Sequence, residues 1–212
     1  MPLIHHLQIN NTTKIGVWHI TEAENFFLSF VPLQRNITHP HKRLQHLAGR
    51  YLLRELFPDF PLSLIQIADT RKPFLEDEAF HFSISHCGDF AAVIVSTQNR
   101  VGVDIEIPHA KIERIQHKFL SEKEKNLLTN MDGENIKMLT MAWSIKEAMF
   151  KWYSHGEIDF IRHLQIQDIS FTDTEERKQE GLIEALFTRD NRIGLKLHFK
   201  MWEELVLSWV AV

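Results

Sequence analysis

The sequence predicts an α+β fold made of two similar lobes, each with a long helix packed on a small, mostly antiparallel sheet. Three observations support this prediction. Each half of the chain contains one long stretch of helical apolar spacing, each half also contains several short strand-like runs, and the elements follow the same order in both halves. We place the lobes at residues 1–100 and 101–212, joined near residues 98–103.

The N-terminal half is expected to begin with a short strand at residues 15–20. A helix follows at residues 21–30, with Thr21 as its N-cap and Glu24 completing a capping box. The long helix is placed at residues 41–57, where apolar residues keep helical spacing between two prolines. Short strands are then expected at residues 65–68, 80–85 and 90–96.

The C-terminal half repeats this order with negligible sequence identity. After a turn at residues 98–100, a strand is expected at residues 101–107. A helical stretch at residues 121–130 precedes the second long helix, at residues 134–153, in which apolar residues again recur at helical spacing. Further strands are expected at residues 163–170, 182–188, 194–200 and 205–212.

The composition is that of an ordinary globular protein, with 44% hydrophobic and 25% charged residues. A formal net charge of -4 provides no basic field for nucleic acid, so we expect none as a partner. Cys87 is the only cysteine, which rules out an intramolecular disulfide and suits a reducing cytoplasm. There is neither a signal-peptide pattern nor an apolar run of membrane-spanning length, so we expect a cytoplasmic protein that does not act at a membrane.

The run VGVDIE places two acids inside a strand-like stretch. Period-two alternation puts four apolar side chains on one face: Val101, Val103, Ile105 and Ile107. Gly102, Asp104 and Glu106 share the other face, where two residues span about 6.6 Å. The two carboxylates could grip one Mg²⁺ ion, and Gly102 would leave room for a ligand beside them. Taken alone, however, the pattern is better explained as an edge strand with a solvated polar face.

The second long helix carries a related group of side chains. Trp143, Glu147 and either Lys151 or Phe150 lie three or four residues apart, on one helical face. A Glu and a Lys at this spacing often form a surface ion pair, which is the better interpretation of the two charges alone. The aromatic residues indicate, however, that this face is partly buried, where an unpaired charge is costly. A metal beside Glu147 and a phosphate beside Lys151 would supply partners.

A third group of polar residues lies in the N-terminal half. Ser85 and His86 end a strand just before a tight turn, and they suit donors to a phosphate better than a hydrolase pair, because no GxSxG motif is present. Lys72 before Pro73 is either a cation of fixed geometry on a loop or part of a solvated turn. Arg43 on the first long helix fits a solvated flank equally well.

The order of these motifs resembles that of the 4′-phosphopantetheinyl transferase superfamily. The motifs run AGRYLLREL, RKPF, FSISH, VGVDIE, FLSEKE and WSIKEAMFK, over residues 40–156. GVDIE and WSIKEAMFK at this separation, preceded by SISH, are the most specific. The resemblance is to the larger, surfactin-synthetase-activating type. It implies a monomer of two similar lobes in one chain, with coenzyme A in the cleft between them.

The resemblance also implies an activity. Members of the superfamily transfer the 4′-phosphopantetheine arm of coenzyme A to a serine of an apo acyl or peptidyl carrier protein, releasing adenosine 3′,5′-bisphosphate. Carried over to this sequence, Asp104, Glu106 and Glu147 would hold Mg²⁺ against the pyrophosphate, and Lys151 would contact the pyrophosphate. Asp104, Glu147 and Lys151 are thus the candidate catalytic residues, with Glu147, or a metal-bound water that it orients, as the base.

The remaining candidates would bind coenzyme A. Ser85 and His86 match the family's phosphate-binding positions, with His86 at the 3′-phosphate, and Lys72 and Pro73 match its Gly-Lys-Pro loop near the nucleotide. Among the basic residues near the first helix that would clamp the 3′-phosphate, the resemblance favours Arg43, with Lys42 and Arg35 as substitutes. The sequence departs from the family where Arg71 replaces the first glycine of that loop, and where Ser154-His155-Gly156 follows the second helix in place of Gly-x-Gly.

The carrier protein is expected to dock on residues 110–128. There, five basic residues alternate with Phe119 and Leu120: Lys111, Arg114, Lys118, Lys123 and Lys125. Carrier proteins are acidic, so the resemblance implies a basic and apolar patch, although an amphipathic helix with a solvated face has the same pattern. Two other functions remain open, namely a non-catalytic relative that binds coenzyme A or a carrier protein, and a Mg²⁺-dependent phosphohydrolase. No residue distinguishes fatty-acid, polyketide and peptide-synthetase carriers.

Overall fold

We describe the chain from a computed structural model, which covers residues 2–33, 36–70, 72–129, 134–172 and 180–212. Among the residues considered above, Arg35, Arg71 and the end of the expected helix at Asn130 lie outside these ranges. The chain divides into two compact units, Met1–Val101 and Gly102–Val210, and each is described by itself.

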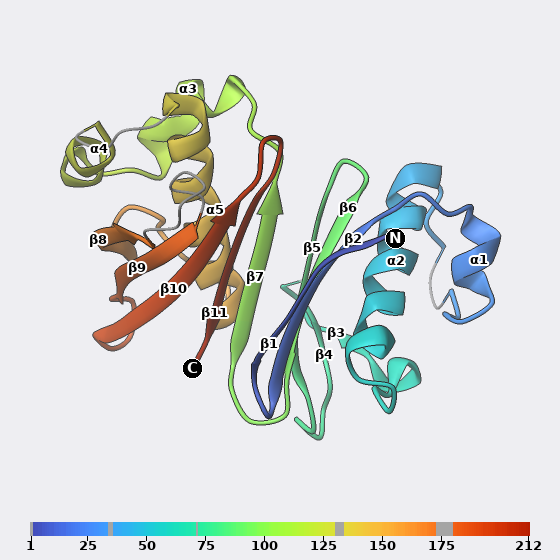
Figure 1. The fold of residues 1–212 in the computed structure, drawn as a ribbon. Coiled ribbons are helices and arrows are strands. Elements are labelled where there is room, and N and C mark those ends of the chain that lie inside the picture. Colours follow the sequence, from blue (N-terminus) through green and yellow to red (C-terminus); the bar gives the residue numbers. More distant parts are fainter. Residues whose placement is uncertain (1, 34–35, 71, 130–133, 173–179) are drawn as a thin grey trace. The chain divides into compact units, whose positions relative to one another are not determined.

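The first unit contains a four-stranded antiparallel sheet (Figure 1). Its strands, in the order β1-β2-β6-β5, are β1 (Leu3–Asn10), β2 (Thr13–His19), β6 (Phe90–Ser96) and β5 (His81–Cys87). The sequence predicted all but β1. That strand lies at an edge, and its exposed residues include Ile4 and Leu7, so the alternation of apolar and polar residues that marks a half-buried strand is missing.

The long helix of this unit, α2 (Pro40–Leu56), packs against β6 and β2. Gly49 allows this helix to lie close to the sheet, because a Cβ atom there would come within 2.8 Å of Ile84 Cγ2. The rest of the unit consists of short elements: α1 (Glu24–Leu28), a 3₁₀ turn (Leu62–Leu64), β3 (Gln66–Ile67) and β4 (Pro73–Phe74).

The start of α1 differs from the prediction. Its N-cap is Ala23 and makes no side-chain cap, so neither Thr21 nor a capping box begins this helix. Both carboxylate oxygens of Glu24 instead accept hydrogen bonds from Arg43 Nε at 2.9 Å. A charge-assisted contact to a guanidinium is stronger than a neutral cap, which explains why the capping box is not formed.

The second unit contains a five-stranded sheet and the helix α5 (Asn135–Tyr153) (Figure 1). The strands, in the order β7-β11-β10-β9-β8, are β7 (Val101–Glu106), β11 (Val206–Ala211), β10 (Ile193–Met201), β9 (Glu180–Phe187) and β8 (Leu164–Phe171). Strands β8 to β11 pair antiparallel in sequence order. Three short helices lie between β7 and α5: α3 (Lys111–Ile115), a 3₁₀ turn (Gln116–Lys118) and α4 (Glu122–Thr129).

These elements confirm the predicted α+β class with antiparallel sheets and a long helix in each half. That the halves are related by pseudo-symmetry stays a prediction. Within the described ranges, no helix is both long enough and apolar enough to cross a membrane.

Gly102 determines how closely α5 approaches β7. A Cβ atom at this position would lie 2.0 Å from the carbonyl oxygen of Ala148 and 2.8 Å from the backbone nitrogen of Trp152. The space beside Gly102 is therefore filled by the helix backbone, which corrects the expectation that it is left open for a ligand. Ile107 is a second correction: it follows the end of β7 and is 37% exposed, instead of joining the buried face.

We expect Gly102→Ala to destabilise the protein. The new methyl group would meet backbone atoms of α5, which cannot move aside as a flexible side chain could, so the helix must shift. Overpacking of this kind costs about 1–3 kcal/mol in the free energy of unfolding, and we expect the upper end. Chemical denaturation would measure it. Gly194→Ala is the matched control, because no atom lies within 4 Å of the Cβ position there; equal losses in both variants would contradict the packing argument.

Candidate functional site

The predicted acidic site lies within the second unit, between β7 and α5. Asp104 and Glu106 come from the strand, on the same face as Gly102, and that face is the one covered by the helix. Glu147 and Lys151 come from α5, one turn apart. The structure thus brings these four predicted residues together in one group, which we call the β7–α5 site.

Asp104 and Lys151 form the central contact of the β7–α5 site. Lys151 Nζ donates to Asp104 Oδ1 at 2.7 Å, and the Asp104 side chain is only 4% exposed. The strand β7 does lie at the edge of its sheet, as the alternative interpretation expected, but its polar face is not solvated at Asp104. A buried carboxylate needs such a partner, because desolvation of an isolated charge is costly.

Glu106 is held by an aromatic residue of α5. The indole Nε1–H of Trp143 donates to Glu106 Oε1 at 3.1 Å. The Trp143 ring is itself enclosed, edge-on to Phe119 with centroids 5.1 Å apart and stacked on Phe160 at 5.4 Å. The sequence showed Trp143 only as a sign of partial burial, although its position one turn before Glu147 places it on the same helical face.

The carboxyl group of Glu147 has a strongly raised pKa. Burial raises its pKa to about 7, and the neighbouring carboxylates of Asp104 and Glu106 add to the rise, while the Lys151 ammonium opposes it. The negative charge of this group is therefore incompletely offset by Lys151. A cation bound near Glu147 would offset the rest and lower its pKa.

This pKa predicts a pH-dependent effect on stability. The folded protein holds a proton on Glu147 up to about pH 7, whereas the unfolded chain loses it near pH 4.5. Because the unfolded state binds fewer protons in this window, the contribution of Glu147 to the free energy of unfolding falls by up to about 3 kcal/mol as pH rises from about 4.5 to 7. Above pH 7 the contribution no longer changes with pH.

Denaturation of the wild type and Glu147→Gln across pH 4–8, without divalent cations, would measure this contribution as the difference between the two proteins. We expect the variant to gain stability relative to the wild type as pH rises. A difference that does not change with pH would contradict the raised pKa.

The donor chemistry of the β7–α5 site fits Mg²⁺, which binds carboxylate oxygens and keeps several waters. Asp104, Glu106 and Glu147 supply three carboxylates from two adjacent elements, and the pKa of Glu147 is raised first by burial and further by the other two carboxylates. In the described part of the chain, however, no three Asp, Glu, His or Cys side chains are grouped as they would be around a metal ion. Binding would therefore require side-chain rotation, and Mg²⁺ stays a prediction.

Comparison with known proteins identifies the family. The family model described as the 4′-phosphopantetheinyl transferase superfamily matches residues 100–208, more than half of the chain and the part that contains the β7–α5 site. The chain belongs to the 4′-phosphopantetheinyl transferase superfamily.

Curated relatives agree with this family. Enterobactin synthase component D of Escherichia coli O157:H7 is 34% identical over 180 residues, which are 79% of this chain and 76% of the relative. The L-aminoadipate-semialdehyde dehydrogenase-phosphopantetheinyl transferase of Xenopus laevis is 30% identical over 50% of this chain and 41% of its own length. Enterobactin synthase component D of Salmonella austin is 30% identical over 53% of this chain and 48% of its own length. Two of these three matches thus span about half of the relative.

Other residues expected to serve a 4′-phosphopantetheinyl transferase lie in the first unit. Ser85 and His86 are neighbours on β5; Ser85 is buried and His86 is exposed, as expected for adjacent strand residues. The turn that follows is tied to α2, because Gln45 Nε2 donates to Gly88 O at 2.7 Å and His41 Nε2 lies 2.9 Å from Asp89 Oδ1.

Arg43, Lys72 and Pro73 occupy ordered positions in the same unit. The guanidinium of Arg43 binds Glu24 and also donates to the carbonyl of Ile37 at 2.9 Å. Pro73 begins β4, and the carbonyl of Lys72 accepts from the backbone of Ala68 at 2.9 Å, which closes the β3–β4 hairpin. Coenzyme A binding by these residues stays a prediction.

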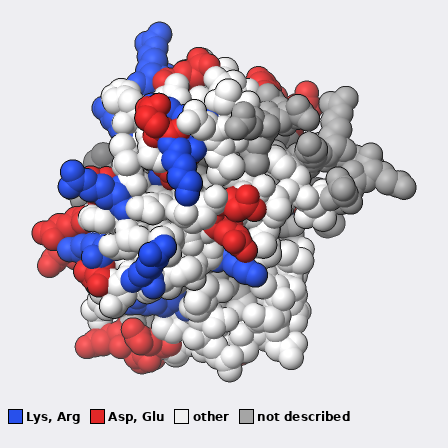
Figure 2. Space-filling model, turned by 90° about the vertical axis from the view of Figure 1, so that its left-hand side faces the viewer, with Lys and Arg blue, Asp and Glu red and all other residues white. Residues whose placement is uncertain are grey.

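The expected carrier-docking patch needs a correction. Phe119 and Leu120 are 0% and 2% exposed, because they belong to the core of the second unit, so they cannot form an apolar surface. Four of the five basic residues are exposed: Lys111, Arg114, Lys118 and Lys123. Lys125 pairs with Glu122 at 2.6 Å. On the face drawn in Figure 2, Lys and Arg side chains are interspersed with Asp and Glu and form no continuous basic area.

Proposed function

We propose that this protein is a 4′-phosphopantetheinyl transferase, a holo-[acyl-carrier-protein] synthase that uses coenzyme A to modify a serine of an apo acyl or peptidyl carrier protein. The observation that carries the proposal is the β7–α5 site, where three carboxylates and a lysine meet inside the segment that matches the family. The names of two relatives, a phosphopantetheinyl transferase and an enterobactin synthase component D, support the same class of activity.

Glu147 is the proposed base. Without a bound cation the pKa of Glu147 is about 7, and Mg²⁺ bound beside it would lower this pKa and favour the ionised carboxylate, the form that accepts a proton from the carrier serine. Glu147 lies on α5, with Trp143 one turn before it and Lys151 one turn after it, and this position would hold the carboxylate ready for the hydroxyl of the carrier serine.

Lys151 is the proposed contact to the pyrophosphate of coenzyme A. Its ammonium has three N–H donors, and one of them is directed at Asp104. Asp104 thereby orients the Lys151 head group, so that it can stabilise negative charge on the departing phosphate. Its side chain is 24% exposed, which leaves it accessible to a ligand.

Asp104, Glu106 and Glu147 would hold Mg²⁺, whose charge would neutralise pyrophosphate oxygens and make phosphorus easier to attack. We assign the phosphates of coenzyme A to Ser85 and His86, with His86 and Arg43 at the 3′-phosphate, and we place Lys72 and Pro73 near the nucleotide. The active form would be a monomer of two pseudo-symmetric lobes, residues 1–100 and 101–212.

Mass spectrometry tests the proposed activity directly. The protein is incubated with coenzyme A, Mg²⁺ and several apo carrier proteins, and each carrier is examined for a gain of the phosphopantetheine mass. Modification of the carrier serine, with release of adenosine 3′,5′-bisphosphate, is expected. If coenzyme A binds but no carrier is modified, the protein is a binding relative; nucleotide hydrolysis that needs no carrier would indicate a phosphohydrolase.

The exposed lysines near α4 should contribute to carrier docking. We expect Lys118→Glu combined with Lys123→Glu to raise the KM for an acidic carrier by roughly tenfold with little change in kcat, because rim charges act mainly on association. Arg192→Glu, which makes the same change of charge per substituted residue at an exposed turn between β9 and β10, is the control. Steady-state kinetics would check this. An unchanged KM in the double variant would refute the docking assignment.

A further inference from the structure

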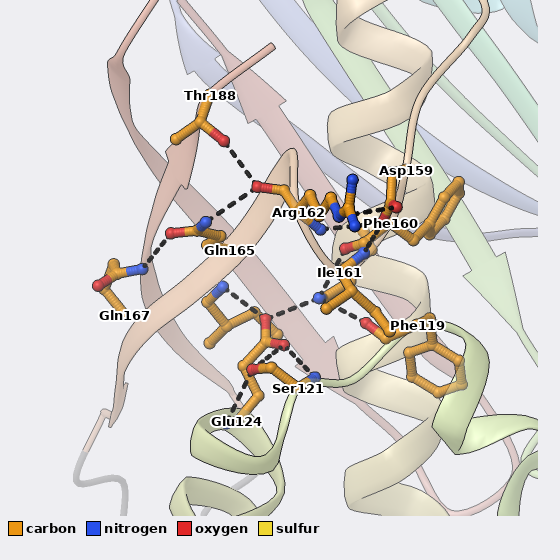
Figure 3. Close-up of polar contacts among 12 residues, drawn as sticks. Phe119, Ser121, Glu124, Asp159, Phe160, Ile161, Arg162, Gln165, Gln167 and Thr188 are labelled. Atoms are coloured by element: carbon orange, nitrogen blue, oxygen red, sulfur yellow. Dashed lines mark hydrogen bonds and ion pairs between the residues drawn. The ribbon is translucent and has the colours of Figure 1, made fainter.

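A buried ion pair lies directly beside the β7–α5 site. Lys146 precedes Glu147 on α5, yet its side chain is 0% exposed, and the Glu124 side chain of α4 is 2% exposed. Lys146 Nζ lies 2.7 Å from Glu124 Oε1 and donates to the backbone carbonyls of Phe119 at 2.6 Å and Phe160 at 2.9 Å. These three acceptors use all three N–H groups of the ammonium. Figure 3 shows the contacts.

Glu124 is equally well satisfied. Its Oε1 also accepts from the backbone N–H of Ile166 in β8 at 2.8 Å, and its Oε2 accepts from the backbone N–H and the hydroxyl of Ser121, both at 2.8 Å (Figure 3). The Lys146–Glu124 pair therefore joins α5 to β8, to the start of α4 and to the turns that carry Phe119 and Phe160. Full satisfaction makes the buried charges tolerable.

The two carbonyls that Lys146 holds belong to the two residues that enclose Trp143. Phe119 meets the Trp143 ring edge-on and Phe160 stacks on it. The turn of Phe160 is fixed further, because Asp159 Oδ1 accepts the backbone N–H groups of Ile161 and Arg162, each at 2.9 Å (Figure 3). One continuous series of contacts thus runs from Lys146, through the two phenylalanines, to Trp143 and its hydrogen bond with Glu106.

A purely stabilising role does not explain this arrangement well. Replacing a buried ion pair with apolar side chains of similar volume is often neutral or favourable for stability. Apolar side chains, however, could not hold the backbone carbonyls of Phe119 and Phe160, and the position of the Trp143 ring depends on those two residues. A lysine is required here because it supplies three directed donors at one point.

We propose that Lys146 and Glu124 are positioning residues for the carboxylate of Glu106, acting through the Phe119–Trp143–Phe160 stack. The role of Glu106 as a Mg²⁺ ligand rests on the proposed function, but the positioning of its carboxylate by the Lys146–Glu124 pair does not. The pair lies outside the group of side chains that would touch Mg²⁺ or coenzyme A, so its effect on activity would be indirect. Residues that orient metal ligands without contacting the metal act in the same way.

The experiment combines Lys146→Met with Glu124→Gln, so that no charge is left buried alone and the amide oxygen can still accept from Ile166. The readout is the indole N–H resonance of Trp143 in proton–nitrogen NMR spectra, assigned by its loss in Trp143→Phe. In the paired variant we expect this resonance to shift and its hydrogen exchange to become faster, because the turns that enclose the Trp143 ring are less firmly held. Glu124→Gln alone is a milder second variant, with a smaller change in the same direction expected.

Ile183→Val is the control, because it trims a fully buried side chain of β9 and leaves every contact of the pair intact. If the paired variant and Glu124→Gln change the Trp143 resonance no more than this control does, the positioning role is overturned. The NMR readout needs no activity, so it holds even if the protein proves not to transfer phosphopantetheine. If transfer is found, the paired variant should need roughly tenfold more Mg²⁺ for half-maximal rate; an unchanged requirement would also overturn the inference.

Discussion

Glu147→Gln is expected to lower the rate of phosphopantetheine transfer by about 10²–10⁴-fold, the usual contribution of a general base. The amide is nearly the same size as the carboxylate, so the packing of α5 against β7 should be preserved. The variant loses the ability to accept a proton at this position, and it also loses one negative charge beside Asp104 and Glu106. Rates from mass spectrometry of the carrier, at saturating coenzyme A, would measure the effect.

Glu203→Gln is the matched control for this prediction, because Glu203 is exposed in the turn between β10 and β11. It should transfer at the wild-type rate. Asp104→Ala should be as inactive as Glu147→Gln, since it removes both a proposed Mg²⁺ ligand and the partner of Lys151. Near-normal turnover in either variant, with circular dichroism showing an intact fold, would refute the assignment of the site.

Lys146→Met alone is expected to reduce the free energy of unfolding by about 3–5 kcal/mol, the usual cost of removing one partner from a buried pair. Methionine fits the space of the lysine chain, so the loss comes from Glu124, which stays buried without its cation, and from two carbonyls without a donor. Burial lowers the pKa of Lys146, and the carboxylate of Glu124 opposes that change.

Urea denaturation would measure this loss. Adding Glu124→Gln should restore much of the stability, because the uncompensated charge is then removed. Lys123→Met is the control: among the residues that the structure describes, this exposed lysine donates only to Gln167, at 3.2 Å, and the loss of stability should stay within about 0.5 kcal/mol. A single variant as stable as this control would show that the pair does not contribute to folding.

Local patterns predicted most of the elements correctly. The long helices follow from apolar spacing, and the central strands from apolar runs and alternation, because these signals arise within a short stretch of chain. The edge strand β1 could not be found this way, since its pairing with β2, and not burial of one face, makes it a strand. The capping box at Thr21 failed because Glu24 binds Arg43, 19 residues further along.

Surface and core were harder to separate. Phe119 and Leu120 alternate with lysines in the sequence and were expected at the surface, but both lie in the core of the second unit. Similarly, Lys146 and Glu124 carry charges and would ordinarily be placed in solvent. The two residues lie 22 positions apart, and Glu124 also binds Ile166, 42 positions further along, which no local period reveals.

The sequence by itself determined the residues of the candidate site. Alternation in VGVDIE puts Asp104 and Glu106 on one face, and helical spacing puts Trp143, Glu147 and Lys151 on another, because both follow from backbone geometry alone. Only the tertiary structure decided how these faces meet. Gly102 lets α5 approach β7, and the resulting burial pairs Lys151 with Asp104 and raises the pKa of Glu147, since desolvation depends on what packs above a residue and not on its neighbours in the chain.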